Sequence, residues 1–281
     1  MTDGTAYVLG HSDHEYQRLM TQSRLMRPWT TRFFRAAGLT EGMSVLDAGS
    51  GLGDVALLVA DIVGSGGRVL GVERDAATTE KARRRAASED CSGLVEFQVA
   101  DLDDFDSPTQ FDALVGRFVL QYQPDPAAAL RRLTRLVRPG GIVVFHDMDF
   151  SNQNPTWPAC WIWDECYALL TKLFQAAGTP PDFGRRLTRT FRDAGLPWPT
   201  VDAAGPSGGA PGSALFSWLS TAMLAIEPQL RKAGIELPAG VTFDDTLAER
   251  LETAVLEQGS QILGPIQYGA WVRVPDGSLP R

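Results

Sequence analysis

The sequence predicts an α/β fold, a Rossmann-like and mostly parallel seven-stranded sheet with helices on both faces. Three observations predict it. Short apolar runs alternate with helical patterns between residues 43 and 147, which is typical of parallel strands joined by helical crossovers. A glycine-rich turn, DAGSGLG at residues 47–53, follows the first run. The 281 residues, of which 44% are hydrophobic and 21% charged, suffice for such a domain with a sizeable insertion.

The N-terminal residues predict helix before the first strand. Apolar side chains recur near helical spacing over residues 12–39. Pro28 is expected to break or kink this helix into two shorter ones, and Gly38 to end the second. We expect residues 1–40 to form a helical arm that closes over the functional site as a lid.

The elements of a cofactor-binding core follow in order over residues 41–150. A stripe of Val55, Leu58, Val59 and Ile62 marks the helix after the glycine turn. Another helix covers about 76–90, and a third begins after Pro126 and stops at Pro139. Five continuous apolar runs predict buried strands, at residues 43–49, 67–73, 94–100, 111–117 and 141–147.

The chain changes character after Asp147. Residues 151–198 are rich in aromatic side chains and mostly helical, which predicts a helical cap. Residues 199–281 are expected to supply the last strands of the core, near 198–205 and 265–274. A helical insertion over about 213–258 interrupts them, and Pro228 is expected to end its first helix.

Composition excludes several classes of function. The formal net charge of −8 argues against nucleic acid as a partner. No apolar run approaches the roughly 18 residues of a membrane span, and the N-terminus has no basic-then-apolar signal peptide. The three cysteines form no C-x-x-C pair and the three histidines no metal-binding cluster. We therefore expect a cytoplasmic protein with reduced thiols and no metal, no membrane partner and a small-molecule ligand.

The glycine turn does not match a dinucleotide fingerprint. Counting from Gly49, the sixth position is Asp54 rather than the glycine of G-x-G-x-x-G. An acid at the start of a helix is expected to repel a pyrophosphate. The spacing D-x-G-x-G-x-G, with Asp47 at the strand end, instead suits a ligand with an ammonium or sulfonium centre.

Acidic residues end the next two strands. Glu73 lies about 20 residues beyond the turn, where a carboxylate accepts from ribose hydroxyls; Asp75 is the fallback. Asp101 is placed to accept from an adenine amine, while the main-chain N–H of Leu102 reaches a ring nitrogen. The alternative for Asp101 is a turn or helix cap.

These segments together resemble the class I S-adenosylmethionine-dependent methyltransferases. The resemblance rests on VLDAGSGLG, VLGVE, VADLDDF and FDALVGRFVLQY…LVRPGGIVVFHD and covers about residues 40–150. PIQYGAWVRV is similar to that family's antiparallel last strand, and YVLGHSDHEYQRL looks like methyltransferases of bacterial small-molecule and secondary metabolism. The resemblance implies S-adenosylmethionine as cofactor and S-adenosylhomocysteine as product. The expected cofactor-binding residues are Asp47, Gly49, Ser50, Gly51, Gly53, Glu73, Arg74, Asp101, Leu102 and Arg117.

The residues after the fourth and fifth strands are candidates for catalysis. His146 is the best base candidate, because imidazole titrates near neutral pH and Asp147 or Asp149 can orient it. The alternative is a hydrogen-bonded, inert histidine at the strand end. Arg117 either binds the methionine carboxylate or a substrate anion, or it pairs with a nearby acid. The expected catalytic residues are His146 and Asp147.

A hydrophobic core beneath the cap accounts best for most of the aromatic residues of the cap, and an apolar or aromatic acceptor pocket is the functional alternative. Tryptophan also attracts a sulfonium by a cation–π contact, and an acid such as Glu165 among apolar walls is a base with a raised pKa. The expected substrate-binding residues are His11, Tyr16, Gln121, Tyr122, Trp157, Trp161 and Glu165.

The sequence thus predicts a methyltransferase acting on a small, largely apolar or aromatic acceptor. Oxygen is the favoured acceptor atom, and nitrogen and carbon are the alternatives. An NAD(P)-dependent oxidoreductase is the alternative, disfavoured by Asp54 and by the lack of a Tyr-x-x-x-Lys pair. A protein that binds the donor without methylating is a third hypothesis. Arm helices that pair between subunits would give a homodimer.

Overall fold

The computed structural model describes residues 13–89, 91 and 93–276. This part of the chain divides into two compact units. The sheet unit comprises residues 28–147, 184–203 and 268–276. The helical unit comprises residues 13–27, 148–183 and 204–267. Neither unit is continuous in sequence. The predicted division into 1–40, 41–150, 151–198 and 199–281 stays a prediction.

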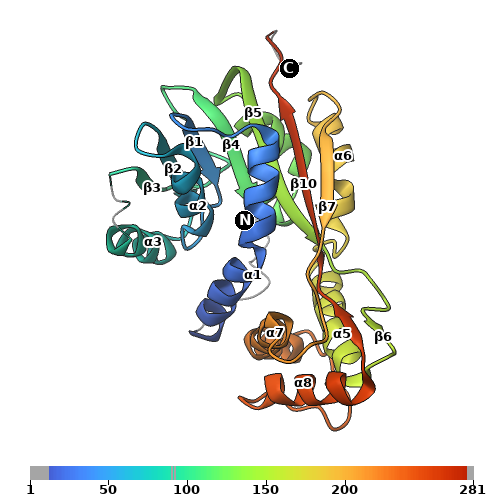
Figure 1. The fold of residues 1–281 in the computed structure, drawn as a ribbon. Helices are drawn as coiled ribbons and strands as arrows, with labels where there is room; N and C mark the ends of the chain where they lie inside the picture. The colour runs from blue at the N-terminus through green and yellow to red at the C-terminus, as the bar shows by residue number, and fades with distance from the viewer. Residues whose placement is uncertain (1–12, 90, 92, 277–281) are drawn as a thin grey trace. The chain divides into compact units, whose positions relative to one another are not determined.

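The sheet unit is built on a seven-stranded sheet with the order β3-β2-β1-β4-β5-β10-β7 (Figure 1). Strands β1 to β5 pair in parallel. The N–H of Gly140, near the start of β5, donates to the carbonyl of Val274, just beyond the end of β10, at 2.9 Å. Strand β10 therefore runs opposite to β5, and the predicted mostly parallel sheet is confirmed. The strands are β1 (Ser44–Ala48), β2 (Arg68–Glu73), β3 (Val95–Val99), β4 (Phe111–Arg117), β5 (Val137–Asp149), β7 (Thr200–Ala204) and β10 (Ile266–Arg273).

Helices pack against this sheet through apolar faces. Val55, Leu58 and Val59 of the stripe expected on the first crossover helix are buried and Ile62 is partly buried, in one core cluster with Val45 of β1 and Phe33 of α1. Burial of these side chains is the main stabilising term. The helices that contribute to the sheet unit are α1 (Asp13–Ala37), α2 (Asp54–Val63), α3 (Ala76–Ser88), η1 (Leu120–Tyr122), α4 (Pro126–Thr134) and α6 (Phe183–Asp193).

The predicted ends of helices at three prolines are wrong. Helix α1 continues through Pro28 rather than dividing into two helices, and α7 (Ala214–Lys232) continues through Pro228. The kink expected at Pro28 stays a prediction. Each proline removes one helical N–H, but residues on both sides of it pack into cores, for example Ile226 and Leu230 of α7, which are fully buried. Pro139 does not end a helix either. It lies within β5, whose pairing with β4 shifts register there, as a bulge permits.

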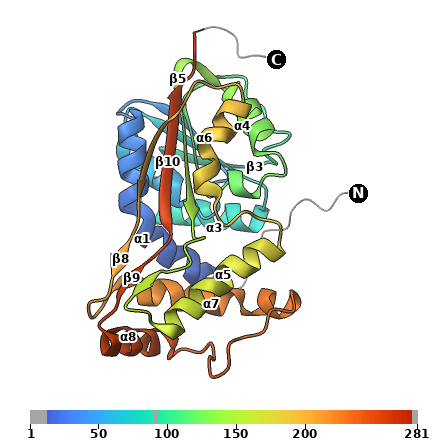
Figure 2. The ribbon, with the colours of Figure 1, turned by 90° about the vertical axis from the view of Figure 1, so that its right-hand side faces the viewer.

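The helical unit combines helices with a small sheet (Figure 2). Its other helices are α5 (Trp161–Ala176) and α8 (Leu247–Gln258). Strands β6 (Thr156–Trp157), β9 (Gln261–Leu263) and β8 (Ser207–Gly208) pair in that order. Strands this short show no period in the sequence, so this sheet was not predicted. Among the described residues, no helix is both long and apolar enough to cross a membrane.

Candidate functional site

The glycine turn follows the fully buried strand β1 and leads into α2. Gly49, Gly51 and Gly53 have φ angles of 65°, 51° and 81°, a region that favours glycine. A Cβ on Gly49 would lie 2.8 Å from Cγ2 of Val119, and one on Gly53 would lie 2.7 Å from Cζ of Phe97. A Cβ on Gly51 would meet nothing within 4 Å. The turn is thus tightly packed at both ends and open at its middle glycine.

Glu73 ties the end of β2 to this turn. Its Oε2 accepts a hydrogen bond from the N–H of Gly51 at 3.1 Å, and its Oε1 accepts from the N–H of Asp75 at 3.0 Å. The carboxylate therefore lies beside the open middle of the turn. Asp75 instead caps α3, since its Oδ1 accepts from the N–H of Thr78 at 2.7 Å. The capping role leaves Glu73 as the candidate for a ribose.

Asp47 is a buried carboxylate at the end of β1. Burial raises the pKa of Asp47 well above its usual value, although the Arg117 charge and the N–H of Ala56 lower that pKa in part. Neither carboxylate oxygen makes a hydrogen bond of good geometry with any described residue. A buried acid of this kind is stabilised by a bound cationic group.

Asp54 does not present the unbalanced negative charge that the sequence suggested. It forms a short ion pair with Arg85 of α3, and its Oδ2 lies 3.8 Å from Nη2 of Arg117. These two arginines offset the acid at the start of α2. Arg117 is itself nearly buried at the end of β4 and donates to Oγ1 of Thr30 at 3.3 Å. This is the paired arrangement expected as one alternative for Arg117; contact with a ligand stays a prediction.

His146 is fully buried, with 0% of its surface exposed. Its Nδ1 lies 3.0 Å from Oγ1 of Thr30. The rings of Phe33 and Phe118 each have centroids 5.2 Å from the imidazole. Phe118 has a φ of 58°, unusual for a non-glycine residue, and its N–H donates to the carbonyl of His146 at 2.9 Å. The imidazole is therefore held in place on several sides.

Asp147 follows His146 and is also fully buried. Burial raises the pKa of Asp147 well above its usual value. Neither of its carboxylate oxygens has a hydrogen-bond partner among the described residues, so Asp147 does not orient the imidazole of His146 through a hydrogen bond. The expected catalytic role of the pair stays a prediction.

The remaining predicted cofactor residues lie at the ends of β2 and β3. Asp101 is exposed, and its Oδ1 accepts from the N–H of Asp103 at 2.9 Å, as in a turn cap. Leu102 is buried, and its carbonyl accepts from Nε of Arg132 at 3.1 Å. Arg74 is exposed. Their contacts with a ligand stay predictions.

Gln121 belongs to η1, directly after β4. It is buried, and neither atom of its amide group has a hydrogen-bond partner in the described part of the chain. Tyr122 is half-buried beside it in sequence. Because Val119 packs against Gly49, the segment that carries Gln121 borders the glycine turn.

The other predicted substrate residues that the structure describes lie in the helical unit. Trp157 and Trp161 are 81% and 55% exposed, and Glu165 on α5 is half-buried. Tyr16 belongs to the first turn of α1, and His11 lies outside the described residues. The role of these five residues stays a prediction.

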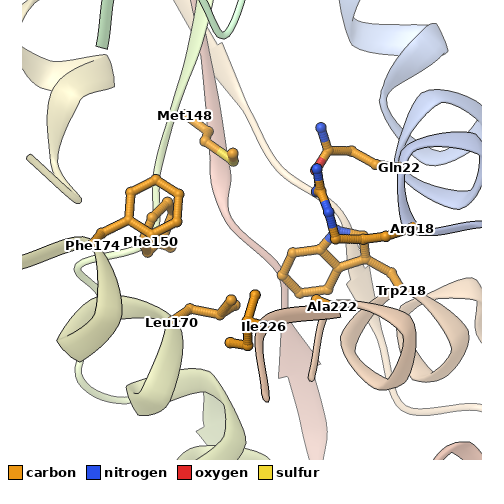
Figure 3. Close-up of a pocket in the computed structure, with 9 residues that line it drawn as sticks. All are labelled: Arg18, Gln22, Met148, Phe150, Leu170, Phe174, Trp218, Ala222 and Ile226. Atoms are coloured by element: carbon orange, nitrogen blue, oxygen red, sulfur yellow. The ribbon is translucent and has the colours of Figure 1, made fainter. Parts of the chain in front are cut away.

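The helical unit contains a pocket that the sequence did not reveal as a whole (Figure 3). The rings of Phe150 and Phe174 meet edge to face there, with centroids 4.5 Å apart. The other lining residues come from segments far apart in sequence. A signal was present in the helical spacing of Trp218, Ala222 and Ile226 and in an arginine on a buried helix face. The lining residues are Arg18, Gln22, Met148, Phe150, Leu170, Phe174, Trp218, Ala222 and Ile226.

Several buried polar groups of the sheet unit have no hydrogen-bond partner among the described residues and match groups of S-adenosylmethionine. Buried atoms without a hydrogen-bond partner in the described chain include both oxygens of Asp47, the hydroxyl of Ser50 and the amide of Gln121. Buried polar atoms are normally paired, so these groups are available to hydrogen-bond a ligand. The carboxylate suits an ammonium group and Glu73 suits a diol. The described residues contain no cluster of three or more histidine, cysteine or acidic side chains that could hold a metal.

Comparison with known proteins agrees with this geometry. A family model described as a methyltransferase domain matches residues 39–180, about half of the chain. The demethylmenaquinone methyltransferase of Staphylococcus aureus is 29% identical over 162 residues, which are 58% of this chain and 61% of that protein. The ubiquinone biosynthesis O-methyltransferase of Alkalilimnicola ehrlichii is 35% identical over 119 residues, which are 42% and 45% of the two chains. The chain thus spans about half the length of these relatives.

A solved structure supports the fold. The crystal structure of a putative methyltransferase from Bacillus halodurans superposes with a TM-score of 0.58 at 14% sequence identity. The match covers 88% of this chain and 98% of that one. At this identity the likeness shows the architecture alone.

Proposed function

Because the chain belongs to the methyltransferase domain family, we propose that it transfers a methyl group from S-adenosylmethionine to a small, largely apolar acceptor. The observation that carries the proposal is the set of unsatisfied buried polar groups around the glycine turn, above all the Asp47 carboxylate. This set lies on the segment that the family model matches.

The sheet unit would hold the donor through residues at the carboxyl ends of its strands, where ligands bind in open α/β sheets. Asp47 faces the ammonium group, and Glu73 accepts from the ribose hydroxyls. Gly51, whose Cβ position is open, lets the main chain approach the ligand. Asp101 and Leu102 take the adenine, and Ser50, Arg74 and Arg117 complete the proposed set.

The bound donor supplies an activated methyl group on a sulfonium, so the protein needs to position the acceptor rather than provide a nucleophile. A hydroxyl acceptor also needs a base. We propose His146 as this base, supported by its place at the end of β5 and by Thr30, which fixes its Nδ1. Its complete burial supports a structural role, and the two roles predict different pH–rate profiles.

The acceptor class is supported by the names of the relatives, which mention demethylmenaquinone and ubiquinone biosynthesis, and by the aromatic lining of the pocket in the helical unit. We propose that the acceptor is an aromatic or otherwise apolar molecule. Oxygen is the acceptor atom that we favour, and nitrogen and carbon are the alternatives. No disulfide joins Cys91, Cys160 and Cys166, which suits a reducing compartment such as the cytoplasm. A homodimer stays a prediction.

Donor-dependent methylation can be tested directly. The purified chain is incubated with S-adenosylmethionine carrying a labelled methyl group and with reduced naphthoquinones and phenols. We expect labelled product and S-adenosylhomocysteine in equal amounts, both reduced in Glu73→Ala at a donor concentration that does not saturate the variant. Oxidation of NADH without donor binding would contradict the proposal. Donor binding with conversion of an acceptor but no label in the product would favour the non-methylating alternative.

A further inference from the structure

The pocket of the helical unit has one polar side and an otherwise apolar wall (Figure 3). Met148 and Phe150 line it from the end of β5 and the residue that follows. Leu170 and Phe174 line it from successive turns of α5. Three successive turns of α7 supply Trp218, Ala222 and Ile226. The cavity volume is about 20 Å³, which is room for one small polar group such as the carboxylate end of a ligand.

The polar side comes from α1. Arg18 and Gln22 lie one turn apart, and Nη1 of Arg18 donates to Oε1 of Gln22 at 2.6 Å. Arg18 is only 3% exposed. In Figure 3 the two side chains point toward each other, on the side of the pocket opposite Met148 and Phe174. A guanidinium is therefore kept at the wall of an apolar cavity, where its field is little screened by water.

Trp218 adds a second donor to the same pocket. Trp218 and Arg18 both line this pocket, and Trp218 is 4% exposed. The indole N–H has no hydrogen-bond partner among the described residues. Buried tryptophan N–H groups usually find an acceptor, so this donor indicates a ligand atom that accepts a hydrogen bond.

We propose that this pocket binds an oxygen anion, a carboxylate or a phenolate, carried on an apolar body. Arg18 and the N–H of Trp218 hold the anionic oxygen, while Met148, Phe150 and Phe174 contact the apolar part next to it. The inference rests on the proposed function in one respect, because it identifies this ligand with the methyl acceptor. It narrows the acceptor class from an apolar molecule to an apolar acid.

The chemistry of the wall favours an anion over a cation or a neutral group. The nine lining residues include one cation and no carboxylate. A ligand cation would face Arg18 and leave the Trp218 donor unsatisfied. A neutral amide would satisfy the donor but would gain no charge-assisted hydrogen bond, which is roughly twice as strong as a neutral one.

Three ligands of one shape test the charge preference: benzoate, benzamide and benzamidinium. Calorimetric titration should give benzoate at least about tenfold tighter binding than benzamide, and no binding of benzamidinium. Arg18→Met should weaken benzoate at least about tenfold and change benzamide by less than about threefold. Trp218→Phe, which keeps most of the ring and removes the N–H, should weaken benzoate about three- to tenfold.

Arg24→Met is the matched control, because Arg24 is exposed on the same helix; its benzoate affinity should equal that of the unchanged protein. Thermal unfolding of each variant verifies that it is folded. If Arg18→Met does not fold, Trp218→Phe tests the pocket independently. Benzoate that binds no tighter than benzamide, or that binds Trp218→Phe undiminished, overturns the proposal.

Titration of S-adenosylmethionine into the same samples separates this inference from the proposed function. Donor binding without a benzoate preference leaves the methyltransferase proposal standing and rejects the anion pocket. A benzoate preference without donor binding supports the pocket as an anion site and rejects the methyltransferase. Labelled methyl transfer to apolar acids, lost in Arg18→Met while donor affinity is kept, supports both.

Discussion

The main-chain N–H of Gly51 donates a hydrogen bond to Oε2 of Glu73 across 3.1 Å. This bond joins the middle of the glycine turn to the end of the neighbouring strand β2. It places a carboxylate beside a glycine whose Cβ position is open. A sugar bound here could contact the main chain at Gly51 and hydrogen-bond to the carboxylate of Glu73.

Glu73→Ala should weaken S-adenosylmethionine binding by about 1–3 kcal/mol, as expected for the loss of a hydrogen bond to a charged group. Asp75→Asn is the matched control two residues away. Its carboxylate caps α3, and asparagine keeps a capping oxygen, so donor affinity should not change. Calorimetric titration of both variants checks the pair. Unchanged affinity in Glu73→Ala together with a loss in Asp75→Asn would transfer the ribose role to Asp75.

Gly51→Ala should lose donor affinity although the space around it is open in the structure. The added methyl group occupies the side of the turn that the ligand approaches. Gly42 has a φ of 83° and is equally open, so Gly42→Ala should carry a similar strain of roughly 1–2 kcal/mol without affecting the donor. Unfolding in urea and donor titration measure the two effects separately. Equal donor affinity in the two variants would contradict the proposed approach of the main chain.

Stability should depend on pH through Asp147. Burial raises the pKa of Asp147 in the folded state, so the folded chain binds the proton more tightly than the unfolded chain. The free energy of unfolding therefore falls as pH rises from about 4 through the folded-state pKa, by about 1.4 kcal/mol for each pH unit between the unfolded-state and folded-state pKa values. Asp147→Asn should make this decline smaller by the contribution of Asp147, as urea unfolding at pH 5, 6.5 and 8 will show; the raised pKa of Asp47 acts in the same direction and stays.

Asp112 provides a control of opposite sign. Burial opposes the shift, but the N–H of Ser44 and the guanidinium of Arg138 lower the pKa of Asp112. Ionised Asp112 stabilises the folded protein. This contribution is fully present above the unfolded-state pKa and is lost as the pH falls through the folded-state pKa. Asp112→Asn should thus lower stability at pH 7 and matter less in acid. Parallel pH profiles for the unchanged protein and Asp147→Asn would refute the role given to Asp147.

His146→Ala distinguishes a base from a structural histidine. A general base contributes about 10²–10⁴-fold to the rate, so kcat should fall by that factor while donor affinity stays nearly unchanged. Thr30→Val breaks the contact with Nδ1 and keeps the imidazole. It should shift the pH–rate profile with a smaller loss of kcat. A large loss of stability or of donor binding in His146→Ala, with kcat nearly intact, would reject the base and support the structural role.

The sequence predicts the sheet unit well because its signals are local. The buried run before Asp47, the glycines and the acid at Glu73 each lie within one strand and its following turn. The burial of His146 and the pairing of Asp54 with Arg85 depend on other elements and could not be derived from spacing. The helix ends predicted at Pro28 and Pro228 are not observed, because the packing of residues on both sides of each proline outweighs the one hydrogen bond that the proline removes.

The pocket of the helical unit was beyond sequence reasoning for the same reason. Arg18, Phe150, Phe174 and Trp218 lie about 200 residues apart at most and share no motif. Their helices carry apolar stripes that predict burial, but not which stripes face each other. Strands β6, β8 and β9, of two or three residues each, likewise show no alternation to recognise.

The central claim is that the sheet unit holds S-adenosylmethionine, and calorimetric titration of the purified protein with this donor, with S-adenosylhomocysteine and with NADH tests it most directly. We predict micromolar binding of the first two ligands and no binding of NADH. Binding of NADH alone would contradict this claim and with it the roles given to Asp47, Gly51 and Glu73.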